Sequence, residues 1–244
     1  MLVKSKVKYI QTLGQKKFRQ EEGVFIAEGP KLVLELVSTV AGNIVEIFAL
    51  KEWIDANKIQ LKAVNCVEVS ATELEKISQL STPNQALAVV KNLDSPVPVA
   101  KKGEIILALD GIRDPGNMGT IIRISDWFGI NQVVCTADSA EVYNPKVVQA
   151  TMGSIARVRI TYLNLHQWLM EQNGISIYAT VLEGRDISTV KKVKEGILLI
   201  GNESAGISHG ILSLADERIT IPRRGGAESL NAAVATGIVL SHLI

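Results

Sequence analysis

Short apolar runs alternate with amphipathic stretches over most of the second part of the chain. The strand-like runs are "EIILALD", "NQVVCTA", "ARVRITY", "SIYATVL", "GILLIGN" and "RITIP", and helical patterns separate most of them. Strands that alternate with helices predict a mostly parallel sheet covered on both faces. Ligands bind at the carboxyl ends of the strands in such sheets, so we expect the chemistry in the loops that follow these runs.

The first part of the chain shows the same alternation on a smaller scale. The runs "VFIAEG", "IVEIFAL", "VNCVEVS" and "ALAVVK" are typical of strands, and helical stretches around "KLVLELVS", "EWIDANK" and "TELEKISQL" separate them. The stretch "NLDSPVPVAKKGE" has the composition of a linker. We therefore predict a small α/β domain over residues 1–95, a linker over 96–103 and a larger α/β domain over 104–244.

Composition narrows the class of protein. With 244 residues, 47% of them hydrophobic, the chain can bury one or two cores. Its apolar runs are far shorter than the roughly 20 residues that span a bilayer, which favours a soluble protein. Lysines at positions 4, 6 and 8 precede no apolar core of a signal peptide, so we expect a cytoplasmic location. The two cysteines and three histidines lack ligand spacing, and no metal site is expected.

The net charge is only +1, but the charges are unevenly distributed. The first 20 residues contain six basic side chains and no acidic one: Lys4, Lys6, Lys8, Lys16, Lys17 and Arg19. Such a cluster is either a solvated face or a surface that contacts phosphates.

Three loops after predicted strands carry unusual chemistry. In "LDGIRDPGNMGTIIRISDWFGI", Asn117 stands where a helix could begin, and Arg123 follows one and a half turns later. This arginine either reaches into solvent or binds an anionic ligand near the helix N-terminus. In "GILLIGNESAGIS", Gly201 allows a ligand to approach the backbone closely, and Glu203 either caps the next helix or acts chemically.

The third loop lies in "ITIPRRGGAESLNAAVATGIVL". Arg223 and Arg224 supply positive charge, two glycines turn the chain, and Ser229 is expected to open and cap the last helix. The chain contains neither a G-x-G-x-x-G fingerprint nor a phosphate loop ending in Gly-Lys-Ser, which disfavours an enzyme that uses NAD or ATP.

These three motifs, in this order, resemble those of the SpoU/TrmH family of RNA ribose 2'-O-methyltransferases in the knotted SPOUT superfamily. The stretches "KKFRQEEGVFIAEGPKLVLELV" and "STPNQALAVVK" are similar to the small RNA-binding domain of L30e-like fold that many members carry. The resemblance covers nearly the whole chain, with one mild departure at Asn202 in the second motif. It implies a SPOUT domain with a C-terminal trefoil knot, which periodicity alone does not reveal.

The resemblance also implies a reaction. A methyl group would move from S-adenosylmethionine to a ribose 2'-hydroxyl of RNA without a metal. The matching catalytic positions are Arg123, Asn117, Glu203, Ser229 and Asn231. A guanidinium is a poor base, so we expect Arg123 to stabilise the developing alkoxide or to hold a phosphate. The proton acceptor is then that phosphate, a water molecule or Glu203.

Cofactor and RNA contacts are carried over in the same way. The cofactor positions are Gly201, Ile221, Leu230 and, as a weaker match, Thr180, although Ile221 and Leu230 could equally be core residues. The expected RNA contacts are Lys16, Lys17, Arg19, Arg223 and Arg224.

The resemblance further implies a homodimer formed by the C-terminal domain, in which the arginine of one subunit approaches the cofactor of the other. The small and apolar segment "SLNAAVATGIVLSHLI" suits such an interface. We expect ribosomal RNA as substrate. The alternatives are a transfer RNA methyltransferase, a non-catalytic RNA-binding or ribosome-assembly protein, and a nucleotide-dependent enzyme that acts on small molecules.

Overall fold

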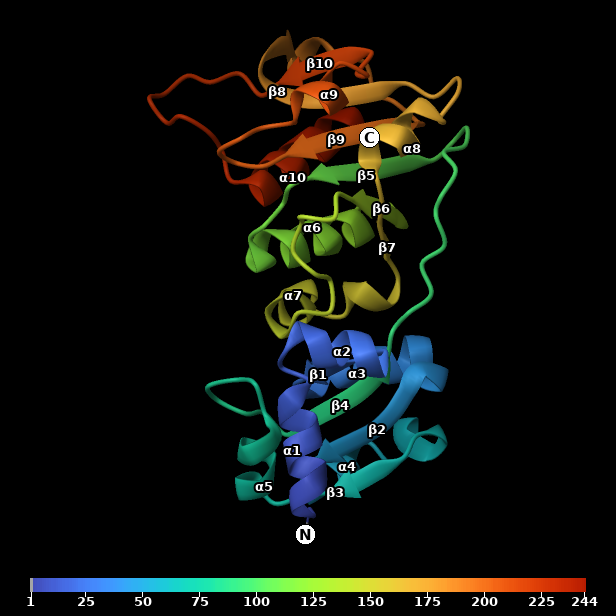
Figure 1. The fold of residues 1–244 in the computed structure, drawn as a ribbon, viewed down its shortest axis with the longest axis vertical. Helices are drawn as coiled ribbons and strands as arrows, with labels where there is room; N and C mark the ends of the chain where they lie inside the picture. Colours follow the sequence, from blue (N-terminus) through green and yellow to red (C-terminus); the bar gives the residue numbers. More distant parts are fainter. Residues whose placement is uncertain (1) are drawn as a thin grey trace. The chain divides into compact units, whose positions relative to one another are not determined.

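The computed structural model describes residues 2–244, which form two compact units (Figure 1). Unit 1 comprises the residues up to Asp94 together with Glu141–Arg157, and unit 2 comprises Ser95–Ala140 and Val158–Ile244. Within the described range, no helix is both long enough and apolar enough to cross a membrane.

Unit 1 is built on a four-stranded sheet in the order β1-β4-β2-β3. The strands are β1 (Val24–Glu28), β2 (Ile44–Ala49), β3 (Cys66–Glu68) and β4 (Ala86–Lys91). β4 is antiparallel to both β1 and β2, whereas β3 is parallel to β2. The helices are α1 (Lys4–Thr12), α2 (Lys16–Glu22), α3 (Pro30–Val40), α4 (Lys51–Ala56), α5 (Ala71–Ile77) and α7 (Pro145–Thr151), with 3₁₀ turns at Ala41–Asn43, Gln60–Ala63 and Ser154–Ala156.

Alternation along β1 fills both faces of this sheet. Val24 and Ile26 face one core, in which Ile10 and Leu13 of α1 and its C-cap pack with α5. Phe25 is fully buried, and its ring stacks on that of Tyr143 with the centroids 4.7 Å apart. Strand side chains that point alternately to opposite faces explain why both layers are apolar.

Residues 141–157 belong to unit 1 because their side chains pack there. Besides the stacking of Tyr143 on Phe25, Glu141 accepts two hydrogen bonds from the guanidinium of Arg19, and Arg157 pairs with Glu35. The division expected from the sequence places this segment in the domain of residues 104–244. The structure differs because these partners come from the first 35 residues, more than 100 positions away along the chain.

Unit 2 contains a six-stranded sheet in the order β10-β8-β9-β5-β6-β7, and every neighbouring pair is parallel. The strands are β5 (Ile105–Asp110), β6 (Gln132–Cys135), β7 (Arg159–Tyr162), β8 (Ile177–Asp186), β9 (Gly196–Gly201) and β10 (Glu217–Thr220). The parallel α/β architecture predicted from the alternating runs is therefore confirmed. The order of the strands reverses between β5 and β9, where open α/β sheets place their ligand sites.

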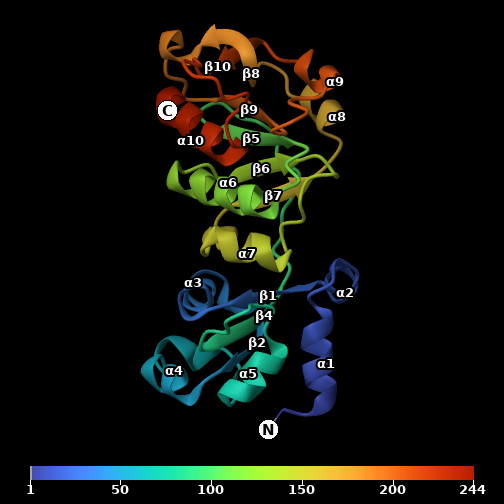
Figure 2. The same ribbon diagram turned by 90° about the vertical axis from the view of Figure 1, so that its left-hand side faces the viewer.

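Helices cover both faces of this sheet. Figure 2 shows α6 (Pro115–Trp127) and α10 (Ala232–Leu243) on one face, with α8 (Leu165–Met170) and α9 (His209–Leu212) on the other; a 3₁₀ turn spans Ile187–Thr189. Ile106 and Ala108 of β5 point into the core beneath α8 and α9. Since successive strand residues alternate, Asp110 lies on that same side.

Candidate active site

The three motifs meet because they follow parallel strands. The first follows β5, the second follows β9, and the third follows β10. β5 and β9 lie side by side with their arrowheads toward the same edge (Figure 1), and Asp110 pairs with Gly201 at that edge. The carboxyl edge of the sheet therefore gathers loops that lie up to 120 residues apart in the sequence.

Asp114 starts the helix of the first motif. Its side chain accepts a 2.7 Å hydrogen bond from the backbone N–H of Asn117, and Pro115 occupies the first helical position. An aspartate cap followed by proline is a favourable helix start, so α6 begins two residues before Asn117 rather than at it. Asn117 consequently lies in the first turn, with its side chain directed at the other two motifs.

Asn117 joins all three motifs. Its side-chain amide donates to Oε1 of Glu203 in the second motif, and its Oδ1 accepts a 2.7 Å hydrogen bond from Nδ2 of Asn231 in the third. An asparagine that donates to a carboxylate must use its oxygen as acceptor, so the two contacts fix one orientation of the amide. Within residues 2–244, Oε2 of Glu203 has no protein partner.

Asn231 caps the last helix. Its Oδ1 accepts from the backbone N–H groups of Ala233 at 3.0 Å and Val234 at 3.2 Å, and α10 begins at Ala232. The expectation that Ser229 caps this helix is therefore wrong, because Ser229 lies two residues outside it and is exposed. A chain of hydrogen bonds thus runs from the N-terminus of α10 through Asn231 and Asn117 to Glu203.

Asn202 holds the loop of the second motif. Its side chain donates to the carbonyl of Gly111 at 2.9 Å and accepts from the backbone N–H groups of Ser204 and Ala205. Gly201 is required beside it, because a Cβ there would lie 2.5 Å from the backbone nitrogen of Ile207. Sequence reasoning treated Asn202 as a departure from the family pattern and missed this role, although asparagine often forms turns in which its side chain bonds the backbone N–H two residues on.

Asp138 holds the loop of the first motif from the neighbouring strand end. Thr136 and Arg113 both donate to its carboxylate, at 2.7 and 2.9 Å, and Thr136 accepts from the N–H of Gly111. The hydrogen bonds from Arg113 and then Thr136 lower the pKa of Asp138 below its usual value. The loop that delivers Asn117 is therefore held by side chains at neutral pH.

The expected cofactor positions lie around an irregularity in β8. Ala179 pairs with Arg218 and Arg185 with Ile219, so residues 180–184 loop out between two adjacent positions of β10. Thr180 donates its hydroxyl to the carbonyl of Leu199 at 2.9 Å, which ties this loop to β9. Thr220 donates to the carbonyl of Leu182 at 3.0 Å, which ties it to β10.

Apolar side chains are exposed around these loops. Leu182 is 71% exposed and Leu230 is 45% exposed, and Ile221 is half-buried. Ile221 and Leu230 are therefore not core residues, and the alternative that they only fill the core is wrong. Exposed apolar side chains can pack on the faces of a flat ring, and nearby backbone groups can bond to its polar edges.

Comparisons with known proteins identify the family of the chain. Residues 104–241 match the model of the SpoU rRNA Methylase family, and residues 4–88 match the MRM3-like substrate binding domain. The chain belongs to the SpoU rRNA methylase family.

Three relatives match the chain over almost its whole length. The 23S rRNA (guanosine(2553)-2'-O)-methyltransferase RlmP of Bacillus subtilis is 30% identical over 241 residues, which is 98% of this chain and 95% of the relative. Among solved structures, an AdoMet-bound rRNA methyltransferase from Sinorhizobium meliloti is 32% identical with a TM-score of 0.87, covering 100% of this chain and 95% of the other. A TrmH-family protein from Porphyromonas gingivalis is 35% identical with a TM-score of 0.86, covering 100% and 98%.

Two expected catalytic residues of the methylase lie outside the hydrogen-bonded chain. Arg123 follows Asn117 by six residues, about 9 Å along the axis of α6, and is exposed without a protein partner in the described part of the chain. Ser229 is also exposed. Trp127 lies one turn beyond Arg123 and is 85% exposed, so the two residues share one exposed face of α6.

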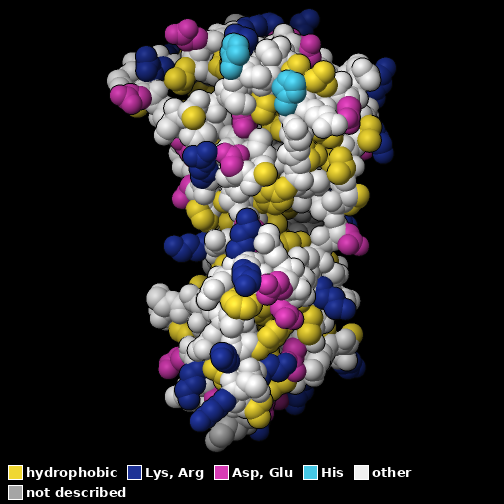
Figure 3. All heavy atoms as spheres, in the orientation of Figure 1, with side chains coloured by type: hydrophobic (Ala, Val, Ile, Leu, Met, Phe, Trp, Pro, Cys, Tyr) yellow, Lys and Arg dark blue, Asp and Glu magenta, His cyan; other side chains and the backbone are white. Residues whose placement is uncertain are grey.

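The basic residues of the methylase divide into exposed and buried ones. Lys16 and Lys17 are exposed in α2, and Lys and Arg side chains gather over α1 and α2 in the view of Figure 3. Arg223 and Arg224 are exposed in the third motif. Arg19 is only 2% exposed and donates to Glu141 and to the carbonyl of Leu13, so its assignment as an RNA contact is wrong. Buried cations normally have such partners.

Proposed function

We propose that the protein transfers the methyl group of S-adenosylmethionine to a ribose 2'-hydroxyl of ribosomal RNA. The observation that carries the proposal is the hydrogen-bonded chain of Glu203, Asn117 and Asn231, one residue from each motif. The relatives named as 23S rRNA 2'-O-methyltransferases, and the match of residues 4–88 to a substrate binding domain, favour ribosomal over transfer RNA.

The loops around β8 fit the cofactor. Thr180, Gly201, Ile221 and Leu230 would hold it, with Leu182 as a further apolar contact. Gly201 keeps the strand end free of a side chain, and the exposed leucines offer apolar surface to an adenine ring. When bound, the cofactor supplies a methyl group that its sulfonium charge already activates. The trefoil knot of the SPOUT superfamily belongs to the same proposal, as does an L30e-like fold for the N-terminal domain.

The protein's own task is to position the ribose and to accept its proton. Asn117 holds one oxygen of the Glu203 carboxylate, and the other oxygen is unshared by protein. The geometry therefore favours Glu203 among the expected proton acceptors, because a fixed carboxylate with a free oxygen can take a proton from a bound hydroxyl. Asn231 supports this orientation through Asn117, and the N-terminus of α10 adds a favourable dipole.

Arg123 acts from a dimer in this proposal. It is exposed on α6 together with Trp127, and Val234 of the neighbouring helix α10 is 51% exposed. A second copy packed on these helices would cover this apolar surface and bring its arginine toward the cofactor loops of the first. There the guanidinium would stabilise the developing alkoxide or hold a phosphate. A cytoplasmic location stays a prediction.

Transfer of tritium from labelled S-adenosylmethionine to RNA tests the proposal. Purified ribosomal RNA lacking the modification should become labelled in ribose, and Glu203→Gln should lower the rate without lowering cofactor affinity. Label in transfer RNA alone would redirect the substrate assignment, and RNA binding without any label would support the non-catalytic alternative. Sedimentation of a monomer at micromolar concentration would contradict the dimer.

A further inference from the structure

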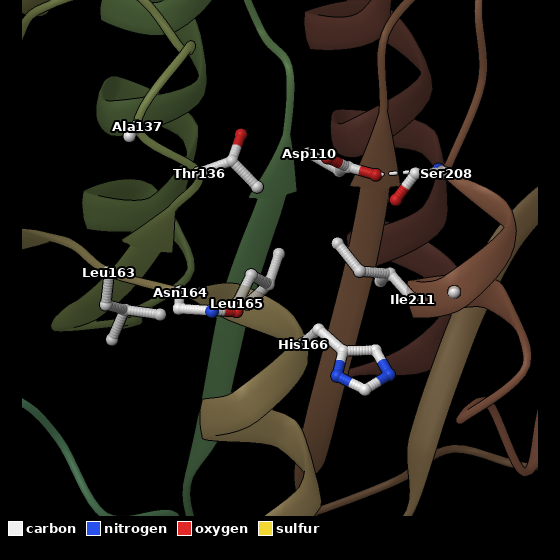
Figure 4. A pocket seen from close by; sticks show the side chains of 10 residues that line it. Asp110, Thr136, Ala137, Leu163, Asn164, Leu165, His166, Ser208 and Ile211 are labelled. Carbon is white, nitrogen blue, oxygen red and sulfur yellow. Dashed lines mark hydrogen bonds between the residues drawn. The ribbon is translucent and has the colours of Figure 1, made fainter.

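A pocket lies at the same edge of the sheet, on the face that α8 and α9 cover. It has a volume of about 480 Å³ and opens between the ends of β5 and β6, the start of α8, and α9. Figure 4 shows Leu163 and Leu165 below it, Ile211 pointing in from α9, and Asp110 and Thr136 at the strand ends. His166 lies at the lower rim and is exposed.

This pocket is distinct from the cofactor loops. Its lining includes none of Thr180, Gly201, Ile221 and Leu230. Asn117 belongs to α6, which covers the opposite face of the sheet (Figure 2). The two sites are nevertheless close along the backbone, since Asp110 directly precedes Gly111, whose carbonyl is held by Asn202. A ligand in the pocket would therefore lie beside the loops that position the reacting groups.

Asp110 gives the pocket its chemical character. The residue is 8% exposed, and Oδ2 accepts a 2.7 Å hydrogen bond from the N–H of Ser208. In the described part of the chain, Oδ1 has no protein partner, and Asp110 lines the pocket. A nearly buried acceptor of this kind is best satisfied by a ligand that brings an N–H or O–H donor.

The rest of the lining excludes an anion and favours a flat ring. The lining contains carboxylate, hydroxyl, amide and imidazole groups but no lysine or arginine among the residues described, so a phosphate would meet a carboxylate without a compensating cation. Half-buried Leu163 supplies apolar surface together with Ile211, Leu165 of the core forms the floor beneath them, and the imidazole of His166 offers a face for stacking. Unpaired RNA bases are recognised by this combination of stacking and edge hydrogen bonds.

We infer that this pocket binds an unpaired RNA base carrying an amino group, from a nucleotide that flanks the methylated one. The inference rests on the proposed function for its RNA substrate. The amino group donates to Oδ1 of Asp110, the ring packs on Leu163 and Ile211, and His166 stacks on the exposed side. Adenosine, cytidine and guanosine each carry such an amino group, whereas uridine presents a carbonyl oxygen where cytidine has its amino group.

Binding can be tested without turnover. The chain has three histidines, His166, His209 and His242, whose ring proton resonances can be assigned with His166→Ala and His209→Ala. Titration of the full chain with cytidine should shift the His166 resonance alone, and uridine should bind several-fold more weakly. An equal response to ribose 5-phosphate, or displacement of cytidine by S-adenosylmethionine, would overturn the inference. Because no methyl transfer is needed, these outcomes are independent of the proposed reaction.

Two variants extend the test to RNA. His166→Ala should raise the KM for ribosomal RNA about tenfold, as expected for one lost stacking contact, without changing kcat or the KM for cofactor. His209→Ala, on α9 but outside the pocket lining, is the matched control and should leave these values unchanged. Asp110→Asn retains an acceptor for Ser208 and should reduce the preference for cytidine over uridine; an unchanged preference would contradict the role of Asp110.

Discussion

Asn231 donates its side-chain amide to Oδ1 of Asn117 across 2.7 Å, and this contact ties the start of α10 to the start of α6. The same Asn231 uses its oxygen to cap α10. The Asn231 side chain therefore has two roles: it stabilises the last helix and it orients the Asn117 amide that holds Glu203. Mutation can separate these two roles.

Asn231→Asp should retain stability and lose activity. Aspartate is as good a helix cap as asparagine, but it cannot donate to Asn117 and would place a second carboxylate beside it. We expect the melting temperature to stay close to that of the wild type, whereas kcat should fall up to about tenfold, the effect of losing one hydrogen bond. Asn231→Ala is the comparison, because it should also cost about 1 kcal/mol of stability through the lost cap. Equal kcat values for the wild type and Asn231→Asp would show that the contact has no catalytic role.

Arg123→Ala should abolish methyl transfer while retaining the fold and the cofactor. The side chain is exposed and has no protein partner in residues 2–244, so its removal should leave the unfolding free energy within about 0.5 kcal/mol. Loss of a preorganised cation at the reacting oxygen should lower kcat about 100- to 1,000-fold. Tritium transfer and calorimetric titration with S-adenosylmethionine would measure the two effects. Arg159→Ala, an exposed arginine at the start of β7, is the control; similar rates for both variants would remove Arg123 from the mechanism.

Gly201→Ala should damage the cofactor site. The added methyl group would overlap the backbone between Gly206 and Ile207, which cannot move away as a flexible side chain would. We expect a loss of about 1–3 kcal/mol in stability and a marked loss of cofactor affinity. Gly225→Ala, where an added Cβ meets no atom within 4 Å, should change neither value. Wild-type cofactor affinity in Gly201→Ala would show that the loop adapts and that the close approach is unnecessary.

Arg19→Ala should destabilise unit 1 rather than weaken phosphate contacts directly. Removing one partner of a buried ion pair leaves the other charge without compensation, at a cost of about 3–5 kcal/mol. Arg19→Met combined with Glu141→Leu should recover much of this loss, because an apolar pair of similar volume avoids the uncompensated charge. Denaturant unfolding would measure the free energy of unfolding of each variant, and Lys16→Ala, at an exposed position of the same helix, is the control. A fully stable Arg19→Ala would contradict the structural role of this pair.

Glu73 should make stability depend on acidic pH. Hydrogen bonds from the backbone N–H groups of Ser70 and Leu2 lower its pKa to about 2, well below the value of about 4.3 in an unfolded chain. Its contribution is therefore complete above the unfolded value and is lost as the pH falls toward 2. Glu73→Gln should lower the melting temperature at pH 7, and the difference from wild type should shrink below about pH 4.3. Glu75→Gln on the same helix is the control, and a difference independent of pH would contradict the assignment.

The sequence predicts the parallel sheet and the meeting of the motifs well, because both depend on local patterns. Each strand of unit 2 is a short apolar run, and parallel strands bring their following loops to one edge whatever their separation along the chain. The same rule predicts the strand-end residues of the pocket beside Asp110. It does not predict the lining residues that come from α8 and α9, because their positions depend on tertiary packing.

The errors concern choices that local sequence leaves open. Ser229 and Asn231 are both good caps, and Asn231 is selected by a partner 114 residues away on α6. Arg19 lies in a basic cluster that suggests a solvated surface, but Glu141, 122 residues later, draws it into the interior. Residues 141–157 lie in unit 1, and not with the rest of residues 104–244, because of partners of the same kind. Tertiary partners of this kind leave no periodic pattern that a single sequence displays.

Residues 141–157 pack in unit 1 although they follow part of unit 2 in the sequence, and this affects folding during biosynthesis. Ribosomes deliver a chain from its N-terminus, and domains generally fold as units during that process. The first 94 residues emerge before β5 and β6, yet the partners of Phe25 and Arg19 are not made until Tyr143 and Glu141 have followed. Unit 1 therefore cannot complete its fold until part of unit 2 has been translated. A nascent chain stalled before residue 141 should be cleaved readily by proteases, whereas unit 1 should resist them in a chain that extends beyond residue 157.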